Sequence, residues 1–240
     1  MSSARALVTG ATGGIGLHIA RQFAEQGWTV LVGARDAARG AEVADRFGGR
    51  PLLLDVTDAE SIAAAAATVS ELDVLVNNAG ISLDTGALVT ETDVEVFRRT
   101  YETNVFGVVA VTNAFLPALR RSAHPRIVNV SSGTGSLTWS TGPNPQFDYQ
   151  AAGTGSGAAY RSSKTALDAL TVFYAQALAH DGVKVNALAP GLRATNLNPQ
   201  AAAAGGDPAE AAAGAVRLAV LPDDGPTGRL FSWDGTVVPW

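Results

Sequence analysis

The chain has 240 residues, of which 47% are hydrophobic and 16% charged, enough apolar sequence for one sizeable core. Its net charge of −5 at pH 7 argues against nucleic acid or an anionic membrane as the main partner. The absence of cysteine excludes disulfides and thiolate sites, and the three histidines show no metal-ligand spacing. No secretory signal is visible and no apolar stretch reaches the ~18 residues of a membrane span, so we expect a cytoplasmic protein.

Short β-branched or aliphatic runs alternate with longer alanine- and leucine-rich segments along the chain. The short runs predict strands near Ala6–Val8, Thr29–Val32, Pro51–Leu54, Val74–Val76, Arg126–Val130, Lys184–Leu188 and Arg229–Ser232. The longer segments predict helices over Ile15–Gln26, Ala37–Phe47, Asp58–Ser70, Asp93–Arg121 and Ala158–His180. This alternation predicts one α/β domain over residues 1–240, with a mostly parallel, doubly wound sheet and helices on both faces.

Two stretches interrupt the alternation. Residues 133–157 are rich in Gly, Ser, Thr, Pro and Asn, and they include Trp139, Phe147 and Tyr149. We interpret this stretch as a loop insertion that walls a pocket, with the three aromatic residues facing a substrate. Residues 192–206 are interpreted as a mobile segment or a weak helix, within a substrate-loop region at 192–220. The composition of both stretches also allows disorder.

A glycine-rich turn follows the first predicted strand and opens the first predicted helix. Glycine permits a tight turn and lets a bulky anion approach the backbone, and the free N–H groups of a helix start favour a phosphate. The Gly-x-x-x-Gly-x-Gly spacing differs from the Gly-x-Gly-x-x-Gly dinucleotide fingerprint. We predict a phosphate-binding site rather than a purely structural turn, formed by Gly10, Thr12, Gly13, Gly14, Ile15 and Gly16.

Tyr160 and Lys164 are four residues apart in the last long predicted helix, so their side chains share one face. A lysine ammonium beside a phenol favours the phenolate, which makes the tyrosine a proton donor and acceptor near neutral pH. The chain has only two lysines, and composition alone gives such a pair with a chance of roughly 0.03. The pair therefore predicts acid–base chemistry rather than a solvated helix face.

Together, the glycine-rich turn and the Tyr160/Lys164 pair resemble the short-chain dehydrogenase/reductase family, and the resemblance covers nearly the whole chain. It implies a Rossmann-type sheet of about seven strands. It also implies further site residues in family order: Asp55 and Val56 at the adenine, Asn78, Ala79 and Gly80 after the fourth strand, Asn104 and Ser132 in the active site, and Pro190, Gly191 and Thr195 near the nicotinamide.

The end of the second predicted strand bears on the choice between NAD and NADP. In the family that the chain resembles, the acidic residue that favours NAD would stand at Ala34, and Arg35 follows it. An arginine attracts a 2′-phosphate, whereas a carboxylate repels it. We therefore predict NADP(H) as the cofactor, with Arg35 as a binding residue. Asp36 either caps the next helix or reaches the ribose and permits the use of NAD.

The resemblance implies roles for four residues in the reduction of a carbonyl group. Tyr160 would donate the proton, and Lys164 would lower the pKa of Tyr160 and hold the nicotinamide ribose. Ser132 would hydrogen-bond the carbonyl oxygen, and Asn104 would anchor a water in a proton relay. Strand side chains alternate, so only one of Ser131 and Ser132 can face the cleft; the family register favours Ser132.

These residues predict an NADPH-dependent oxidoreductase of the carbonyl-reductase type that acts on a small-molecule ketone or aldehyde, with no nucleic-acid or membrane partner. Two alternatives stay open: NAD-dependent alcohol oxidation, and a regulatory protein that senses NADP without turnover. A sugar epimerase or dehydratase is a weaker interpretation, because such relatives carry a larger C-terminal substrate domain.

Two features depart from the family pattern. Ser132 and Tyr160 are 28 residues apart, about twice the spacing of most relatives, and this insertion resembles the carbonyl-reductase-like branch. Such insertions can hinder the usual pairing of subunits, so the sequence does not distinguish a monomer from a homo-oligomer. Arg193 stands where relatives usually have Val or Ile. We predict that its side chain points to solvent, the alternatives being contact with an anionic substrate or with the cofactor pyrophosphate.

Overall fold

The computed structural model describes residues 3–84, 86–144, 155–203 and 206–240. Within these ranges the centre of the molecule is an eight-stranded sheet in the order β3-β2-β1-β4-β5-β6-β7-β8. The strands are β1 (Arg5–Thr9), β2 (Thr29–Ala34), β3 (Arg50–Leu53), β4 (Val74–Asn77), β5 (Arg126–Val130), β6 (Lys184–Ala189), β7 (Leu230–Ser232) and β8 (Val237–Val238). All neighbouring strands are parallel except β7 and β8. The seven predicted strands are confirmed, and β8 adds a short antiparallel edge.

The helices connect these strands. They are α1 (Gly14–Glu25), α2 (Ala37–Asp45), α3 (Ala59–Ala67), α4 (Val94–Tyr101), α5 (Gly107–Leu119), α6 (Leu137–Thr141), α8 (Ala158–Ala177), α9 (Pro199–Ala203) and α10 (Pro208–Ala219). The single helix predicted over Asp93–Arg121 is divided into α4 and α5 by a π-helical turn, η1 (Glu102–Phe106). Short 3₁₀ turns form η2 (Gly133–Gly135) and η3 (Ala179–Asp181).

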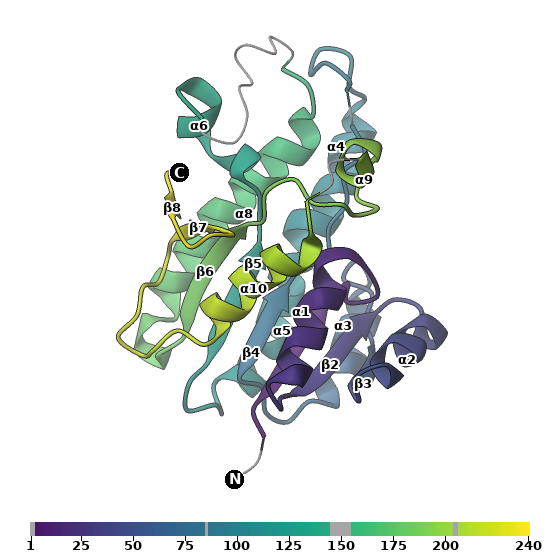
Figure 1. Ribbon diagram of the computed structural model, residues 1–240, viewed down its shortest axis with the longest axis vertical. Coiled ribbons are helices and arrows are strands. Elements are labelled where there is room, and N and C mark those ends of the chain that lie inside the picture. Colours follow the sequence, from purple (N-terminus) through teal and green to yellow (C-terminus); the bar gives the residue numbers. More distant parts are fainter. Residues whose placement is uncertain (1–2, 85, 145–154, 204–205) are drawn as a thin grey trace.

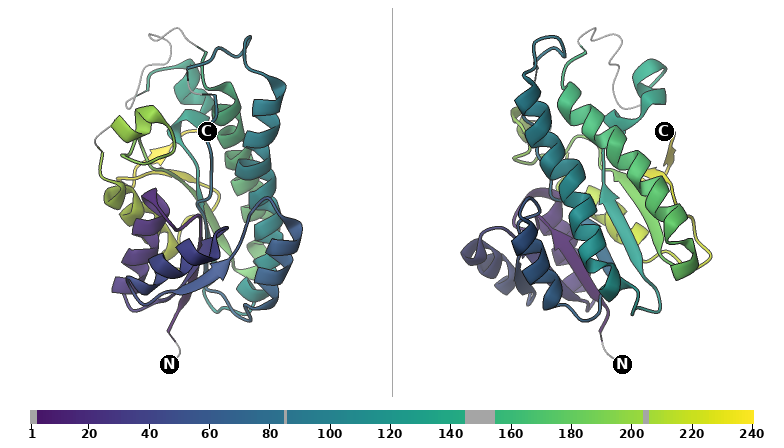
Figure 2. Two further views of the ribbon diagram at one scale, coloured as in Figure 1. Left: turned by 90° about the vertical axis from the view of Figure 1, so that its right-hand side faces the viewer. Right: turned by 180° about the vertical axis from the view of Figure 1, so that it is seen from behind.

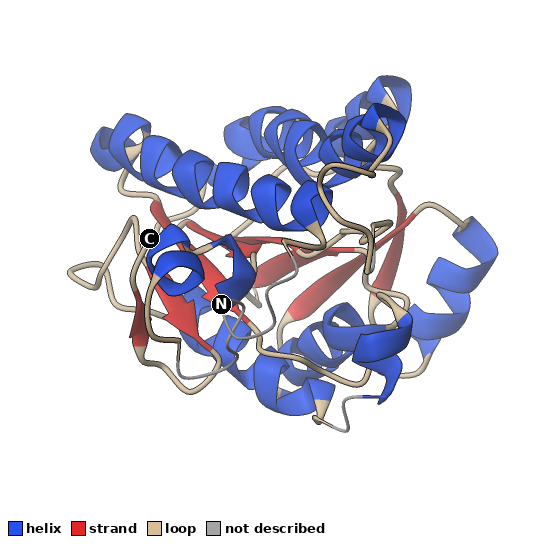
Figure 3. Ribbon diagram, turned by 90° about the horizontal axis from the view of Figure 1, so that it is seen from above, coloured by secondary structure: helices blue, strands red, loops and turns tan. Residues whose placement is uncertain are grey.

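Helices cover both faces of the sheet, as the alternating pattern predicts (Figure 3). Successive side chains of β1 point to opposite faces. Ala6 and Val8 join the apolar cluster under α1, α2 and α10, whereas Leu7 joins the cluster under α3, α5 and α8. Both clusters are buried, which explains why the strands are continuously apolar in sequence.

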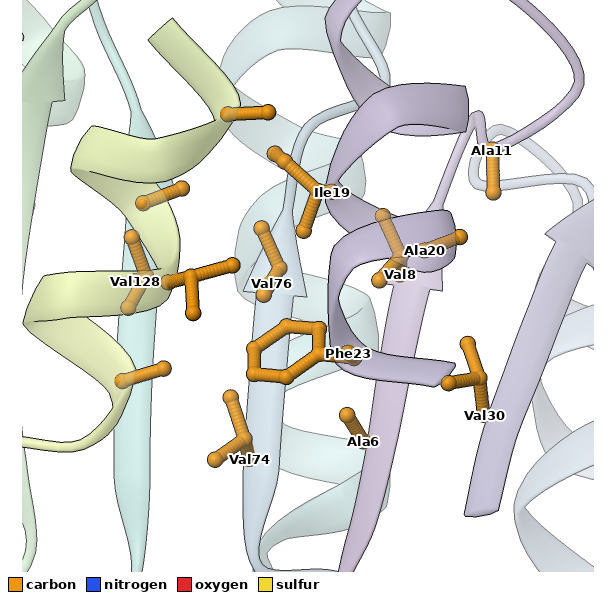
Figure 4. Packing of buried hydrophobic residues seen from close by; sticks show 14 of the residues in the cluster. Ala6, Val8, Ala11, Ile19, Ala20, Phe23, Val30, Val74, Val76 and Val128 are labelled. Atoms are coloured by element: carbon orange, nitrogen blue, oxygen red, sulfur yellow. The ribbon is translucent and has the colours of Figure 1, made fainter. Parts of the chain in front are cut away.

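The close-up of the first cluster shows how α1 packs on the sheet (Figure 4). Ile19 and Phe23 project from α1 toward Val76 and Val74 of β4, with Val128 of β5 beside them. All five are almost completely buried. Burial of each such side chain contributes about 1.5–3 kcal/mol, so this cluster fixes the position of the helix whose N-terminus opens the predicted phosphate site.

Helix α10 was not predicted, because residues 192–220 were interpreted as a substrate-loop region. Much of that region is helical and contributes to the core. From Pro208 onward α10 packs against α1 and buries residues such as Ala212 and Val216. The sequence does contain a start signal, since the Asp207 side chain accepts a hydrogen bond from the backbone N–H of Ala209 and Pro208 occupies the first turn.

The carboxyl ends of the parallel strands lie at one edge of the sheet, toward α6 and α9 in Figure 1. On the face seen from behind, α4, η1 and α5 follow one another as one long helix, and α8 runs beside it across the sheet (Figure 2). The glycine-rich turn, the residues after β4 and β5, and the start of α8 therefore meet at this edge, as expected for ligand sites in open α/β sheets.

Candidate active site

An open pocket of about 780 Å³ lies at the carboxyl ends of the strands. Most of the predicted site residues border it: Gly10, Thr12, Gly13, Gly14, Ile15, Arg35, Asp55, Val56, Asn78, Ala79, Gly80, Tyr160, Lys164, Pro190 and Thr195. Gly16, Asn104, Ser132 and Gly191 do not border the open space.

The pocket wall also contains residues that the sequence analysis did not predict as site residues: Ala34, Leu54, Thr57, Ile81, Leu83, Arg99, Glu102, Thr103, Val130, Ser131, Asn196 and Leu197. Several are chain neighbours of predicted residues. Ile81 follows Gly80, and Thr103 precedes Asn104. Their position next to a motif is the only feature of the sequence that could have indicated these residues. Which neighbours border the pocket depends on the folded structure.

The glycine-rich turn adopts backbone angles that explain its composition. Gly10 and Gly14 have φ angles of +61° and +53°, in the left-handed region that favours glycine. At Gly16, a Cβ atom would lie 2.3 Å from Nδ2 of Asn78. The missing side chain of Gly16 therefore lets α1 approach the turn that follows β4.

Hydrogen bonds join these two turns. The Thr9 hydroxyl accepts from the backbone N–H groups of Asn78 and Ala79 at 2.9 and 3.0 Å. The Asn78 amide donates to the Thr9 carbonyl at 2.8 Å and to the Gly10 carbonyl at 3.2 Å. These four hydrogen bonds thus hold the glycine-rich turn against the turn that follows β4.

Lys164 and Tyr160 lie on one face of α8, as predicted. The Lys164 Nζ lies 5.6 Å from the centroid of the Tyr160 ring and donates to the Val130 carbonyl at 2.9 Å. Burial lowers the pKa of Lys164 to about 8, and the nearby Asp168 carboxylate opposes this shift. Burial raises the pKa of Asp168 to about 7, against the effects of its hydrogen bond from Ser131 and of the Lys164 charge. Burial thus shifts both groups toward their neutral forms, and their mutual attraction opposes both shifts.

Ser131 and Ser132 have different hydrogen-bond partners. The Ser131 hydroxyl is buried and donates to Oδ1 of Asp168 at 2.5 Å, although Ser131 itself borders the pocket. The Ser132 hydroxyl is half-buried and lies 2.9 Å from the Thr134 hydroxyl. The Ser131 hydroxyl is thus committed to a buried carboxylate, whereas the Ser132 hydroxyl has a neutral partner.

Asn104 lies in the π-helical turn η1 and is fully buried. Its Nδ2 donates to the Ile81 carbonyl at 2.9 Å and to the Ser163 hydroxyl at 3.0 Å, and its Oδ1 accepts from the Ile81 N–H at 2.9 Å. A Cβ at Gly80 would lie 3.3 Å from Oδ1 of Asn104 and 3.6 Å from Nζ of Lys164. Asn104 therefore lies behind the pocket wall, close to Lys164.

The residues at the end of β2 distinguish the two roles considered for Asp36. Its carboxylate accepts a hydrogen bond from the backbone N–H of Arg39 at 2.9 Å and caps α2, as one alternative predicted. Arg35 is exposed and borders the pocket, whereas Asp36 does not. Positive charge, and not negative charge, faces the pocket at this position.

The prediction that Arg193 points to solvent is wrong. The side chain is 7% exposed and lies over the Trp233 ring, 4.3 Å from its centroid. Its Nε donates to the Pro190 carbonyl at 2.7 Å, and its Nη1 pairs with Glu210 at 2.6 Å. The guanidinium thus connects the turn after β6 to α10, because a ring face and two acceptors converge on it.

Replacing Arg193 by methionine should lower the free energy of unfolding by about 1–3 kcal/mol, because the Pro190 carbonyl and Glu210 lose a charged donor. Urea denaturation measures this loss. Arg39→Met is the matched control, since it removes an exposed ion pair to Glu42 of the same 2.6 Å length and should cost about 0–1 kcal/mol. Equal losses in the two variants would contradict the buried role.

The interpretation of Trp139 as a residue facing the substrate is also wrong. Trp139 lies in α6, is 9% exposed and packs in an apolar cluster with Ala187, Leu230 and Val238. The Trp139 side chain therefore covers apolar residues of β6, β7 and β8. The other two aromatic residues of the insertion, Phe147 and Tyr149, lie outside the described residues.

Comparisons with known proteins agree with the fold. The family model described as short chain dehydrogenase matches residues 4–145 and 148–204. The galactitol 2-dehydrogenase (L-tagatose-forming) of Cereibacter sphaeroides is 34% identical over 263 aligned positions, which cover 100% of this chain and 97% of that protein. Among solved structures, an NADPH-bound carbonyl reductase from chicken fatty liver superposes with a TM-score of 0.83 at 26% identity, covering 100% of both chains. ElxO with NADP bound gives 0.80 at 28% identity, covering 96% and 97%.

The chain belongs to the short-chain dehydrogenase family. It is an oxidoreductase of that family with a single-domain, Rossmann-like α/β fold. Over the described residues, no group of three or more His, Asp or Glu side chains is placed to hold a metal ion. No helix in those residues is long and apolar enough to cross a membrane.

Proposed function

We propose that this protein is an NADPH-dependent carbonyl reductase that converts a ketone or aldehyde into an alcohol. The observation that carries the proposal is that Tyr160 and Lys164 border the same pocket as the glycine-rich turn. A proton-transfer group and a phosphate-binding turn thus share one open space, which a dinucleotide and a small substrate would occupy together.

The residues of the glycine-rich turn fit a dinucleotide. Helix α1 begins after Gly13 with no side-chain cap on its N-terminal N–H groups and no acidic residue in its first turn. These N–H groups and the positive end of the helix dipole favour a pyrophosphate. Asp55 and Val56 border the end of the pocket near β3, where the resemblance places the adenine. When bound, NADPH would supply the hydride.

The choice of NADPH over NADH rests on Arg35. Arg35 is exposed and borders the pocket at the end of β2, and the neighbouring Asp36 carboxylate caps α2. A 2′-phosphate would meet the Arg35 cation at this place, and the adjacent Asp36 carboxylate is engaged in capping α2. The NADPH-bound carbonyl reductase and ElxO with NADP bound, which share this fold, support the same choice.

Tyr160 would donate its phenolic proton to the carbonyl oxygen as that oxygen becomes an alkoxide. Lys164 would act through its charge: the ammonium lies 5.6 Å from the Tyr160 ring and favours the phenolate that remains after proton transfer. The same ammonium would bind the nicotinamide ribose. The nearby Asp168 carboxylate favours this charged form, against the burial that lowers the pKa of Lys164.

Ser132 would hydrogen-bond the carbonyl oxygen and stabilise the developing negative charge. Ser131, and not Ser132, borders the open space, but the Ser131 hydroxyl is bonded to buried Asp168, whereas the half-buried Ser132 hydroxyl has only the neutral Thr134 hydroxyl to exchange for a substrate oxygen. Asn104 would anchor a water that returns a proton to Tyr160, since its Oδ1 and the Lys164 ammonium approach the same glycine, Gly80.

The proposal is tested with two measurements on the purified protein. Tryptophan fluorescence should show that NADPH binds at least ~10-fold more tightly than NADH, about 1.4 kcal/mol. NADPH oxidation is then followed across a panel of ketones and aldehydes, and at least one should be reduced. Preference for NADH would favour the alternative of NAD-dependent alcohol oxidation. NADPH binding without turnover on any carbonyl would favour a cofactor sensor.

A further inference from the structure

The helix that carries Tyr160 begins without a cap of its own. Gly157 precedes α8 in a left-handed conformation, contributes no side-chain hydrogen bond, and no acidic residue occupies the first turn. By contrast α2, α3, α4 and α10 each begin with an aspartate whose carboxylate accepts backbone N–H groups. The N-terminal N–H groups of a helix lack intrahelical partners and need acceptors from elsewhere.

Asp84 supplies these acceptors from the segment that follows β4. Its Oδ2 accepts from the Ala159 N–H at 2.6 Å, and its Oδ1 accepts from the Tyr160 N–H at 3.3 Å. The residue is 3% exposed. A buried carboxylate is costly unless its oxygens are hydrogen-bonded, and the positive end of the helix dipole stabilises it further.

Tyr160 is the third residue of α8. The Arg161 N–H donates to the Gly157 carbonyl at 2.9 Å, so the Tyr160 N–H precedes the N–H groups that bond within the helix, whereas the Tyr160 carbonyl accepts from the Ser163 hydroxyl at 2.6 Å. Lys164 lies one turn further on, and its Nζ is held by the Val130 carbonyl. Loss of the Asp84 carboxylate would therefore loosen Tyr160 more than Lys164.

The segment around Asp84 is fixed at both ends. On one side Ile81 is bonded through its N–H and its carbonyl to Asn104, and Ile81 and Leu83 border the pocket. On the other side Leu88 forms an isolated bridge with Ser156, just before α8. Asp84 thus lies between the pocket wall and the start of the catalytic helix.

We propose that Asp84 is a positioning residue: its carboxylate holds the first turn of α8 so that the Tyr160 hydroxyl is aimed into the pocket beside Ile81 and Leu83. This inference rests on the proposed function of Tyr160 as the proton donor. It predicts an effect on turnover that exceeds the effect on cofactor binding, because Lys164 and the glycine-rich turn are held by other contacts.

The test compares Asp84→Ala and Asp84→Asn with the wild-type enzyme, using a carbonyl substrate found in the screen. Asp84→Ala should lower kcat about 10-fold or more while the Kd for NADPH stays nearly constant, since a small misplacement of a reacting group is costly. Asp84→Asn should retain more activity than Asp84→Ala, because an amide oxygen can still accept the Ala159 N–H. If the alanine variant does not fold, a lower kcat in Asp84→Asn at unchanged Kd supports the inference.

Asp93→Ala is the matched control. Asp93 caps α4 by accepting the Glu95 N–H at 2.8 Å, is exposed, and does not border the pocket, so its loss should leave kcat unchanged. A wild-type kcat in both Asp84→Ala and Asp84→Asn would overturn the inference. An equal fall in kcat in Asp84→Ala and Asp93→Ala would also overturn it. Absence of turnover in the wild-type enzyme would instead overturn the proposed function. In that case, amide hydrogen exchange at Ala159 and Tyr160 still tests the cap: exchange that Asp84→Ala does not accelerate overturns it.

Discussion

Replacing Tyr160 by phenylalanine should lower kcat by about 10²–10⁴-fold and leave NADPH binding nearly unchanged. The substitution removes one oxygen atom, the proposed proton donor. It keeps the ring that borders the pocket and lies 5.6 Å from the Lys164 ammonium. Rates of NADPH oxidation with an active ketone give kcat, and fluorescence titration gives the cofactor Kd.

Tyr174→Phe is the control for this experiment. Tyr174 lies on the same helix, but its hydroxyl donates to Oδ1 of Asn113 at 2.9 Å and the residue does not border the pocket. Its loss should leave kcat close to the wild-type value. Full activity in Tyr160→Phe would remove Tyr160 from the mechanism, and an equal loss in both variants would indicate general damage to α8.

The parts of the fold and of the site that could be predicted are those specified by local sequence. The glycine-rich turn depends on residues close together in the chain, and Gly10 and Gly14 have the positive φ angles that the turn requires. Tyr160 and Lys164 share a helix face because of their spacing alone. The strands could be predicted because both faces of the sheet are covered, which makes their apolar runs continuous.

The incorrect interpretations concern side chains whose partners are distant in the sequence. The interpretation of Arg193 rests on its departure from a family pattern, but Trp233 and Glu210 bury its side chain. The interpretation of Trp139 rests on the composition of the insertion, but residues of β6, β7 and β8 bury its ring. A charged residue is expected at the surface unless it is paired, and that pairing was not visible in the sequence. The same limit applies to Asp84, whose partners are 75 and 76 positions away.

Arg35 differs from these cases, because the chain around it specifies its surroundings. β2 ends at Ala34, α2 begins at Ala37, and the two residues between them have opposite charge. The Asp36 carboxylate accepts a hydrogen bond from the Arg39 N–H, so it points toward the first turn of α2. Arg35 then remains at the pocket as the charge that a dinucleotide would meet, which makes it the point at which cofactor choice can be tested.

Arg35→Asp should weaken NADPH binding at least ~10-fold and leave NADH binding almost unchanged. A carboxylate at this position repels a 2′-phosphate but can accept hydrogen bonds from a free ribose hydroxyl.

Arg21→Asp is the matched control, because this substitution makes the same change in net charge away from the pocket. Arg21 is exposed, pairs with Glu25 on α1 and does not border the pocket. The difference between the two variants should shrink at high salt, since the contact is exposed and therefore screened. Equal losses of affinity for NADPH and NADH in Arg35→Asp would show that Arg35 does not recognise the 2′-phosphate. The proposed preference for NADPH would then be wrong.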